Sequence, residues 1–429
     1  MENSVKNLIQ FIDHSPSCFH VIENAKKQFL EHGFIQLEEK EHWNLEEGKS
    51  YFVERNGSSM IAFHLPKKDF QGFHIVASHS DSPTYRIKEQ PEMSVEKHYT
   101  KLNIERYGGM IPETWFDRPL SVAGRIIIEE NGQIKDQLVN IDRDLMIIPN
   151  LAIHMSRSSN ESKQLNPQKD LLPLCGGNLT KDGFEEMIAK ESGVEKEDIL
   201  SYDLFLYNRM RGTTLGINEE FVAAPKLDDL ECAYSSIEGM LNAKLSKDYV
   251  TVCAVFDNEE VGSGTKQGAG STFFPEVLKR ISYLCGKNEE EYYMAVADSF
   301  MLSADNAHAV HPNYQDKTDP TNRPYINEGI VLKYNASQKY TTDANSAALV
   351  KYLCKKEKIK CQVFFNRSDI LGGSTLGNIL TGQVSIKAAD IGLPQLSMHS
   401  TYETAGCKDL DDMITLMESF YELGKEVQI

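Results

Sequence analysis

The second half of the chain alternates between apolar runs and helical repeats of apolar residues. Helical spacing predicts helices over 227–243, 273–285, 340–355, 374–381 and 408–425. Short apolar runs predict strands over 249–256, 292–297, 361–366 and 386–390. This alternation is typical of a doubly wound α/β sheet, in which the loops at the carboxyl ends of the strands bind ligands.

The start of the chain shows the same kinds of segment. Apolar positions at helical spacing predict two helices within 4–32, the second beginning near Pro16. Strand-like runs follow at 51–54, 60–64 and 72–78. We therefore expect residues 1–92 and 219–429 to be the two parts of one α/β catalytic domain with a mixed sheet.

The middle of the chain has a different pattern. Alternating segments at 124–130 and 137–142, with Asn131-Gly132 between them, predict an antiparallel hairpin. A helix near 181–190 and a strand near 203–207 follow. Residues 93–218 are therefore predicted to be a β-rich domain inserted into the catalytic one, since a stretch of this length is too long for a loop.

Composition narrows the class of protein. The 429 residues are 41% hydrophobic and 25% charged, which is ordinary for a soluble globular enzyme. A net charge of −18 argues against nucleic-acid binding. The eight cysteines form no Cys-x-x-Cys pair and suit a reducing compartment. With no signal peptide and no apolar stretch of roughly 20 residues, we expect a cytoplasmic protein without a membrane span.

The most informative motif is Asp257-Asn-Glu-Glu-Val-Gly-Ser263, which directly follows the apolar run 250–256. Four polar or acidic residues at the end of a buried strand cost stability unless negative charge is needed there. Of two adjacent glutamates, one can bind a metal ion while the other acts as a general base on water. Taken alone, the motif also fits an acidic loop that caps the next helix.

Four further polar clusters lie at predicted strand or helix ends. They are His79-Ser-Asp81, Asp228-Asp229, Asp305 to His311, and His399 to Glu403. An aspartate two residues after a histidine can orient the imidazole through its second nitrogen. Acidic residues also cap helix starts, and we assign Asp229 mainly to that role.

These clusters predict a metal site. Two histidines and three or more carboxylates from strand ends suit two divalent ions about 3.5–4 Å apart, with one carboxylate bridging them. Mixed imidazole and carboxylate ligands predict zinc, with manganese or cobalt as substitutes. The chain has no His-Glu-x-x-His, no Gly-x-Ser-x-Gly and no Walker sequence, so those three classes are disfavoured.

The same motifs resemble those of a known family. In chain order they are His79-Ser-Asp-Ser-Pro, Lys226-Leu-Asp-Asp, Asp257-Asn-Glu-Glu-Val-Gly-Ser, Ala304-Asp-Asn-Ala-His-Ala-Val-His-Pro-Asn-Tyr and Met398-His-Ser. They are similar to the aspartyl aminopeptidase family of cocatalytic metallopeptidases. The likeness includes Tyr107-Gly-Gly, Trp115-Phe-Asp-Arg-Pro-Leu and Asn150-Leu-Ala-Ile-His154, and it covers almost the whole chain.

The resemblance implies a role for each residue at the metal site. His79 and Asp305 would hold one ion, and Glu260 and His399 the other. Asp228 would bridge the two ions. The two remaining assignments are Glu259 as general base and Asp81 as the residue that holds the His79 ring.

The resemblance also implies substrate contacts and an assembly. His311 and Lys333 match positions near the substrate side chain, while His308 fits substrate contact and structural support equally well. His154, on the inserted domain, matches a histidine that reaches a neighbouring subunit's active site. In the family this domain mediates dimerisation, and the dimers build a dodecamer.

The function implied is removal of N-terminal residues, Asp or Glu, from peptides. Residues 367–375 depart from the family pattern in a loop expected to line the substrate cleft, so an aminopeptidase with a neutral preference is an alternative. A related cocatalytic carboxypeptidase or deacylase would use the same ligand pattern. An idle assembly or cargo-binding protein is disfavoured, because every ligand and the base are present.

Overall fold

A nine-stranded mixed sheet forms the centre of the larger unit. The computed structural model describes residues 2–155, 164–179 and 182–427. In spatial order the strands are β1 (Ile35–Leu37), β2 (Lys49–Arg55), β3 (Ser59–Leu65), β13 (Val250–Phe256), β4 (Phe73–His79), β14 (Phe300–Ala304), β18 (Lys387–Gly392), β16 (Ile330–Lys333) and β17 (Cys361–Phe364). Strand β4 runs parallel to β13 and β14, and β14 runs parallel to β18, so these four strands end at one edge of the sheet.

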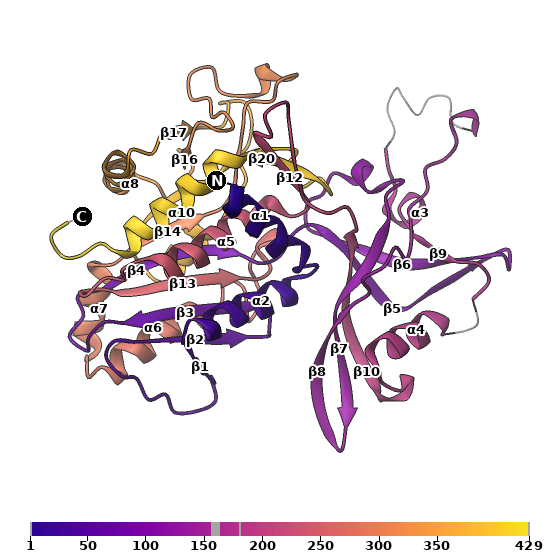
Figure 1. Ribbon diagram of the computed structural model, residues 1–429, viewed down its shortest axis with the longest axis horizontal. Coiled ribbons are helices and arrows are strands. Elements are labelled where there is room, and N and C mark those ends of the chain that lie inside the picture. Colours follow the sequence, from indigo (N-terminus) through magenta and orange to yellow (C-terminus); the bar gives the residue numbers. More distant parts are fainter. Residues whose placement is uncertain (1, 156–163, 180–181, 428–429) are drawn as a thin grey trace.

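Helices cover both faces of this sheet (Figure 1). One face packs against α1 (Glu2–Asp13), α2 (Cys18–Glu31), α5 (Leu227–Asn242), α8 (Ala344–Glu357) and α10 (Cys407–Tyr421). The other packs against α6 (Phe273–Leu284), α7 (Glu289–Ala297) and α9 (Leu376–Gln383). Because successive side chains of a strand point to opposite faces, Ile75 and Val76 enter different cores. The expected doubly wound α/β architecture is confirmed.

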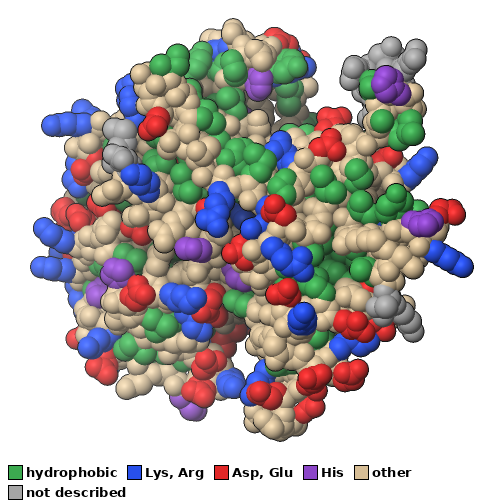
Figure 2. Space-filling model, turned by 45° about the vertical axis from the view of Figure 1, so that its right-hand side comes forward, with side chains coloured by type: hydrophobic (Ala, Val, Ile, Leu, Met, Phe, Trp, Pro, Cys, Tyr) green, Lys and Arg blue, Asp and Glu red, His purple; other side chains and the backbone are tan. Residues whose placement is uncertain are grey.

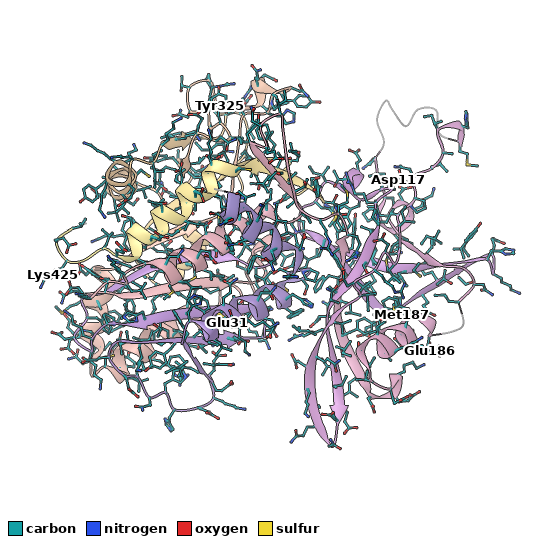
Figure 3. All side chains as sticks on the ribbon, in the orientation of Figure 1. Glu31, Asp117, Glu186, Met187, Tyr325 and Lys425 are labelled. Carbon is teal, nitrogen blue, oxygen red and sulfur yellow. The ribbon has the colours of Figure 1, made fainter. Side chains whose placement is uncertain are left out.

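A second, antiparallel sheet forms the β-rich unit at the right of Figure 1. Its order is β8 (Gln133–Asn140), β7 (Leu120–Glu130), β10 (Ile199–Asn208), β5 (Thr84–Val95), β6 (Tyr99–Tyr107) and β9 (Leu174–Gly176). Asn131 and Gly132 both have positive φ at the β7–β8 turn, which is the conformation that an Asn-Gly hairpin requires. Helix α4 (Gly183–Ser192), on which Figure 3 labels Glu186 and Met187, packs Phe184 into this unit's own core.

A third sheet lies next to the site-bearing edge. Its five strands are β11 (Thr213–Leu215), β12 (Phe221–Ala224), β20 (Glu403–Gly406), β19 (Pro394–Leu396) and β15 (Ala307–His308). The short helices are η1 (Pro112–Trp115), η2 (Ile153–Met155), α3 (Pro167–Asp170), η4 (Lys196–Asp198), η5 (Glu259–Val261) and η6 (Gln315–Lys317). Among the described helices, none has the length and apolar character needed to cross a membrane. The eight cysteines are free thiols.

One expectation about the elements was wrong. Residues 292–297 were expected to be a strand, but they belong to helix α7, and the strand is β14 at Phe300–Ala304. The reason is a capping box between Asn288 and Glu291 in front of an acidic first turn, which starts a helix. The six-stranded sheet begins at Thr84, before the boundary expected at residue 93, and β11 pairs in the third sheet. We therefore propose 84–208 as the inserted unit.

Candidate metal centre

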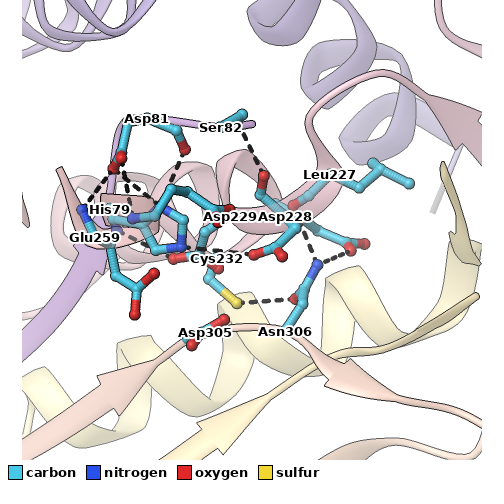
Figure 4. Close-up of polar contacts among 12 residues, drawn as sticks. His79, Asp81, Ser82, Leu227, Asp228, Asp229, Cys232, Glu259, Asp305 and Asn306 are labelled. Carbon is cyan, nitrogen blue, oxygen red and sulfur yellow. Dashed lines mark hydrogen bonds and ion pairs between the residues drawn. The ribbon is translucent and has the colours of Figure 1, made fainter. Parts of the chain in front are cut away.

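Three strand ends bring the acidic and imidazole side chains together. His79 is the last residue of β4 and pairs in register with Phe256, the last residue of β13. Asp305 directly follows β14, the other parallel neighbour of β4. The Glu259-Glu260 turn follows β13, so these groups meet at one edge of the sheet, as Figure 4 shows for His79, Glu259 and Asp305.

Three overlapping groups of side chains could each hold a cation. In each group the ligand atoms all lie within 4.8 Å of one another. The groups are His79 with Asp228, Asp229 and Asp305; His79 with Glu259 and Glu260; and Asp228 with Glu260 and His399. All five residues expected as metal ligands are therefore brought together.

Asp228 lies between the two histidines. Its Oδ1 is 3.5 Å from His79 Nε2, and its Oδ2 is 3.3 Å from His399 Nε2. Glu260 Oε1 is 3.4 Å from the same nitrogen of His399. One carboxylate thus faces two different imidazoles, which is the arrangement a bridging ligand needs.

The tautomers of the histidines suit metal binding. The Nδ1–H of His79 donates to the Asp81 carbonyl oxygen at 3.0 Å, and the Nδ1–H of His399 donates to the Gly109 carbonyl oxygen. Both Nε2 atoms face carboxylates of the cluster, so a cation bound there would take the place of a proton on each ring. A backbone or carboxylate partner on the second ring nitrogen is the usual support of a ligating imidazole.

Unpartnered oxygens in the cluster also fit a cation. Within the described part of the chain, Asp228 Oδ1, Asp229 Oδ1 and Glu260 Oε1 are buried without a hydrogen-bond partner. A buried anionic oxygen without a partner is costly. Divalent cations would remove that cost, and the imidazole and carboxylate set suits zinc.

Burial and neighbouring charges shift the pKa values of the carboxylates in the cluster. Burial raises the pKa of Glu259 to about 8, and the charge of Asp305 adds to the rise. Burial also raises the pKa of Glu260 and of Asp229 well above their ordinary values. Asp228 differs: burial opposes its ionisation, but the two imidazoles that face it, those of His399 and His79, lower its pKa.

Asp81 supports the acidic turn as well as the His79 ring. Its Oδ1 accepts the backbone N–H of Glu259 at 3.1 Å, and its Oδ2 accepts that of Glu260 at 3.1 Å. The His79 Nδ1 is 3.4 Å from Asp81 Oδ1, farther than from the Asp81 carbonyl oxygen. The carboxylate therefore fixes the turn, while the carbonyl holds the ring.

Asp229 does not cap a helix, so that interpretation was wrong. Asp228 and Asp229 have non-helical φ and ψ, and no side chain caps the start of α5. The fully buried Asp229 carboxylate instead accepts the backbone N–H of His79 at 3.1 Å. The spacing of residues in the sequence does not reveal this contact with the end of β4.

Glu259 and Glu260 differ in their surroundings. The turn that carries them is bounded by positive φ at Asn258 and Gly262. The Glu260 carboxylate lies against His399, whereas Glu259 is half-buried and its side chain accepts no hydrogen bond from the residues described. Glu259 is therefore the carboxylate that is free to exchange protons with a bound molecule.

The three expected substrate contacts have different positions. Lys333, only 2% exposed, donates to the Asp305 carbonyl oxygen at 2.7 Å and lies 3.5 Å from Asp305 Oδ2. His308 is exposed on β15, and its ring centroid is 6.0 Å from that of Phe364. His311 accepts the backbone N–H of Asn313 at its Nδ1 and packs against Tyr314. Of the three, Lys333 is tied directly to a predicted ligand.

His154 lies apart from the cluster. It is exposed in η2 of the β-rich unit. No hydrogen bond or ion pair joins it to the predicted ligands in the described part of this chain. A role at an active site therefore needs a second subunit.

The supporting contacts of two residues in or near the recognised motifs were not predicted from the sequence. The Tyr107 hydroxyl donates to Asp81 Oδ2 at 2.6 Å and accepts from Asn258 Nδ2 at 2.8 Å. Glu403 accepts the backbone N–H groups of Asp228 and His399. Tyr107 lies within a motif that carries the family likeness, and Glu403 closely follows another such motif. The spacing of residues along the chain gives no sign of these contacts.

A doubly wound sheet with an imidazole and carboxylate cluster at the carboxyl ends of its strands is typical of metal-dependent hydrolases. The chain belongs to the M18 family: the family described as "Aminopeptidase I zinc metalloprotease (M18)" matches residues 11–421. The resemblance drawn from the sequence motifs is thus confirmed.

Relatives match along the whole chain. A "Probable M18 family aminopeptidase 2" of Clostridium acetobutylicum is 46% identical, over 97% of this chain and 98% of its own. In the cryo-EM structure of the Ape4 and Nbr1 complex, the matching chain is 36% identical with a TM-score of 0.95, over 98% of this chain and 85% of that one. The S. cerevisiae mApe1 dodecamer is 26% identical with a TM-score of 0.85, over 98% and 97%.

Proposed function

We propose that this M18 aminopeptidase family member uses two divalent ions, preferably zinc, to remove N-terminal residues from peptides. The observation that carries the proposal is the Asp228 carboxylate, whose two oxygens face His79 and His399. A single ion would not need one carboxylate directed at two imidazoles. A half-buried glutamate without a partner, Glu259, lies beside the same cluster.

The residues would divide between the ions as follows. His79 and Asp305 would hold one ion, Glu260 and His399 the other, and Asp228 would contact both. Bound there, the ions would polarise the peptide carbonyl and lower the pKa of water toward neutrality. Asp81 keeps the turn with Glu259 and Glu260 in place through two backbone hydrogen bonds.

Glu259 is the proposed general base. It would take a proton from the attacking water and pass it to the nitrogen of the departing peptide. A base works best with a pKa near the working pH, and burial already raises the pKa of Glu259 to about 8 before a cation is present. Positive charge beside Glu259 would lower its pKa from that value toward neutrality.

A second subunit would complete the site. We propose that the β-rich unit pairs two chains, and that His154 of one chain supports the developing oxyanion in the other. Exposed apolar side chains on the β-rich unit support this proposal. A homo-oligomer, built from dimers to a dodecamer, would follow the assembly named for the S. cerevisiae mApe1 structure. The eight free thiols suit a cytoplasmic enzyme.

An acidic N-terminal residue is the proposed preference. The buried Lys333 ammonium contacts the backbone of Asp305, and His308 and His311 follow Asp305 closely along the chain. Burial opposes the charge on Lys333, but Asp305 raises its pKa, so the cation persists. One observation favours the alternative of a neutral preference: this ammonium is already bonded to the Asp305 carbonyl oxygen and lies near the Asp305 carboxylate.

The decisive experiment is a panel of fluorogenic aminoacyl substrates. Each would be assayed after chelation and after addition of Zn²⁺, Mn²⁺ or Co²⁺. We expect hydrolysis only with metal, and faster hydrolysis of Asp and Glu than of Leu or Ala substrates. In Lys333→Met the preference for acidic over neutral residues should disappear. Metal-dependent release of leucine with no hydrolysis of acidic substrates would establish the neutral alternative.

A further inference from the structure

Glu403 is a buried carboxylate that belongs to none of the three cation-binding groups among the described residues. Its Oε2 accepts the backbone N–H of Asp228 at 3.0 Å. Its Oε1 accepts the backbone N–H of His399 at 2.7 Å. One side chain thus joins the two chain segments that carry the predicted bridging ligand and one imidazole ligand.

Backbone hydrogen bonds hold both segments in place. His399 has a φ of 65°, in the left-handed region that side-chain-bearing residues adopt infrequently. Its N–H is held by Glu403, and its carbonyl oxygen accepts the N–H of Ile111 at 3.0 Å. Asp228 is held in the same way, since its N–H donates to Glu403 and its carbonyl oxygen accepts from Ser82 Oγ at 3.0 Å.

A chain of amides extends from Glu403 beneath the cluster. Gln395 Nε2 donates to Glu403 Oε1 at 3.5 Å, and Gln395 Oε1 accepts from Asn306 Nδ2 at 2.8 Å. Asn306 adjoins Asp305, and its Nδ2 also donates to the Leu227 carbonyl oxygen at 3.1 Å. Figure 4 shows Asn306 beneath Asp228 with this contact. The polar chain therefore links the segments that carry Asp228, Asp305 and His399.

We propose that Glu403 is a positioning residue that sets the relative placement of Asp228 and His399, and so the affinity for the ion these two residues share. The inference rests on the proposed two-metal function. The positioning role requires two acceptor oxygens on one side chain, because both partners, the backbone groups of Asp228 and His399, are N–H donors. A glutamine has the same shape but one acceptor, and its NH₂ group would face an N–H. A buried donor left without an acceptor is costly, so one of the two segments would shift.

The test is a cobalt titration of the metal-free full-length protein. Visible absorption of Co²⁺ reports the ligand geometry, and equilibrium dialysis gives the two dissociation constants. We expect Glu403→Gln to weaken the binding of the ion shared by Asp228 and His399 by roughly 10–100-fold, as loss of a supporting group does. The absorption band of that ion should also change. The other ion, which keeps His79 and Asp305, should bind within a few-fold of wild type.

The matched control is Glu47→Gln. Glu47 also accepts a backbone N–H, that of Lys68 at 2.7 Å, but lies exposed on the surface away from the cluster. The Glu47→Gln variant should bind both cobalt ions as the wild type does. If Glu403→Gln does not fold, Glu403→Asp is the second variant. Its shorter side chain cannot reach both N–H groups at once, so the same selective loss is expected.

The outcomes separate the two proposals. If the wild type fails to bind two ions, the proposed function fails with it. If the wild type binds two and the Glu403 variants show unchanged affinities and spectra, only the positioning role is wrong. Equal weakening of both ions together with a lower Tm of the metal-free variant would also overturn that role, because it would show a general loss of structure rather than a shift at the site shared by Asp228 and His399.

Discussion

The two units bury their apolar residues to different extents. In the nine-stranded sheet, β4 and β13 are buried along their whole length between two layers of helices. In the β-rich unit, β8 is mostly exposed, and Ile134 and Tyr99 are 72% and 56% exposed. Figure 2 shows hydrophobic side chains on the surface of the right-hand lobe, which is the β-rich unit. The nine-stranded sheet is covered by helices on both faces, whereas the β-rich unit has its own core but leaves apolar side chains exposed, where we propose that a second chain packs.

The units also differ in where charge is concentrated. Carboxylates without hydrogen-bond partners gather at one edge of the nine-stranded sheet, where a cation can compensate them. The β-rich unit contributes hydrogen bonds to that edge through Tyr107 and Gly109, but no member of a described cation-binding group. The described cation-binding groups therefore lie outside the β-rich unit, which supports them through a few hydrogen bonds.

The largest expected effect concerns the edge of the nine-stranded sheet. We expect Glu259→Gln to lower turnover by roughly 10²–10⁴-fold, the usual range for a general base, with metal content unchanged. Glu260→Gln should instead lose metal, because Glu260 lies against His399. Kinetics and metal analysis of both variants decide; loss of metal in Glu259→Gln alone would show that the two roles are exchanged.

The next largest effect is expected for His154 of the β-rich unit, which would act at the active site of a neighbouring subunit. His154→Ala should cost about 2.7–4 kcal/mol of transition-state stabilisation if His154 is an oxyanion donor, with metal binding and assembly intact. Subunits of His154→Ala and Glu259→Gln, each inactive, would be mixed and allowed to reassemble. Recovered activity is expected, since some sites would combine an intact His154 with an intact Glu259. No recovery despite measured subunit exchange would contradict a shared site.

Metal removal should make the stability of the nine-stranded unit depend on pH. Burial raises the pKa of Glu259 to about 8 in the folded protein, above the value of an exposed glutamate. A raised pKa means that the folded state binds the proton more tightly, so stability is lost as pH rises from about 4.5 to 8. We expect the Tm of the chelated protein to fall over this range by several degrees more than that of the zinc-loaded protein. Parallel curves would contradict the assignment.

The smallest effect should come from the surface of the β-rich unit. Ile134→Glu places a charge on an exposed apolar position of β8 and should weaken subunit association by about tenfold or more. Gln133→Glu is the matched control, because it adds the same charge at a neighbouring exposed polar position. Sedimentation velocity would compare the two. Equal association of both variants would place the interface elsewhere.

The sequence predicted most elements of the nine-stranded unit because their patterns are local. The apolar run 250–256 and the helical repeat over 408–425 match β13 and α10 closely. The segment 292–297 was misassigned, since its apolar residues favour a strand while a capping box outside it starts a helix. Local propensity is overridden by the neighbouring cap in such cases.

The candidate site was predictable in its ligands but not in its supports. His79, Asp228 and His399 stand in distinctive motifs, and their convergence follows from strand ends that share one edge. Asp229 was misread because a buried carboxylate and a helix cap look alike in sequence, and only the fold shows that it accepts the His79 N–H. Glu403 and Tyr107 act through contacts between distant segments, for which a single sequence carries no spacing signal.

The central claim is that Asp228 ties two ions together, and a count of ions per chain tests it most directly. Native mass spectrometry of the zinc-loaded protein should show two ions in the wild type and in Asp229→Asn, because an amide oxygen can still accept the His79 N–H. Asp228→Asn should hold fewer than two. One ion in the wild type, or equal loss in the two variants, would contradict the account.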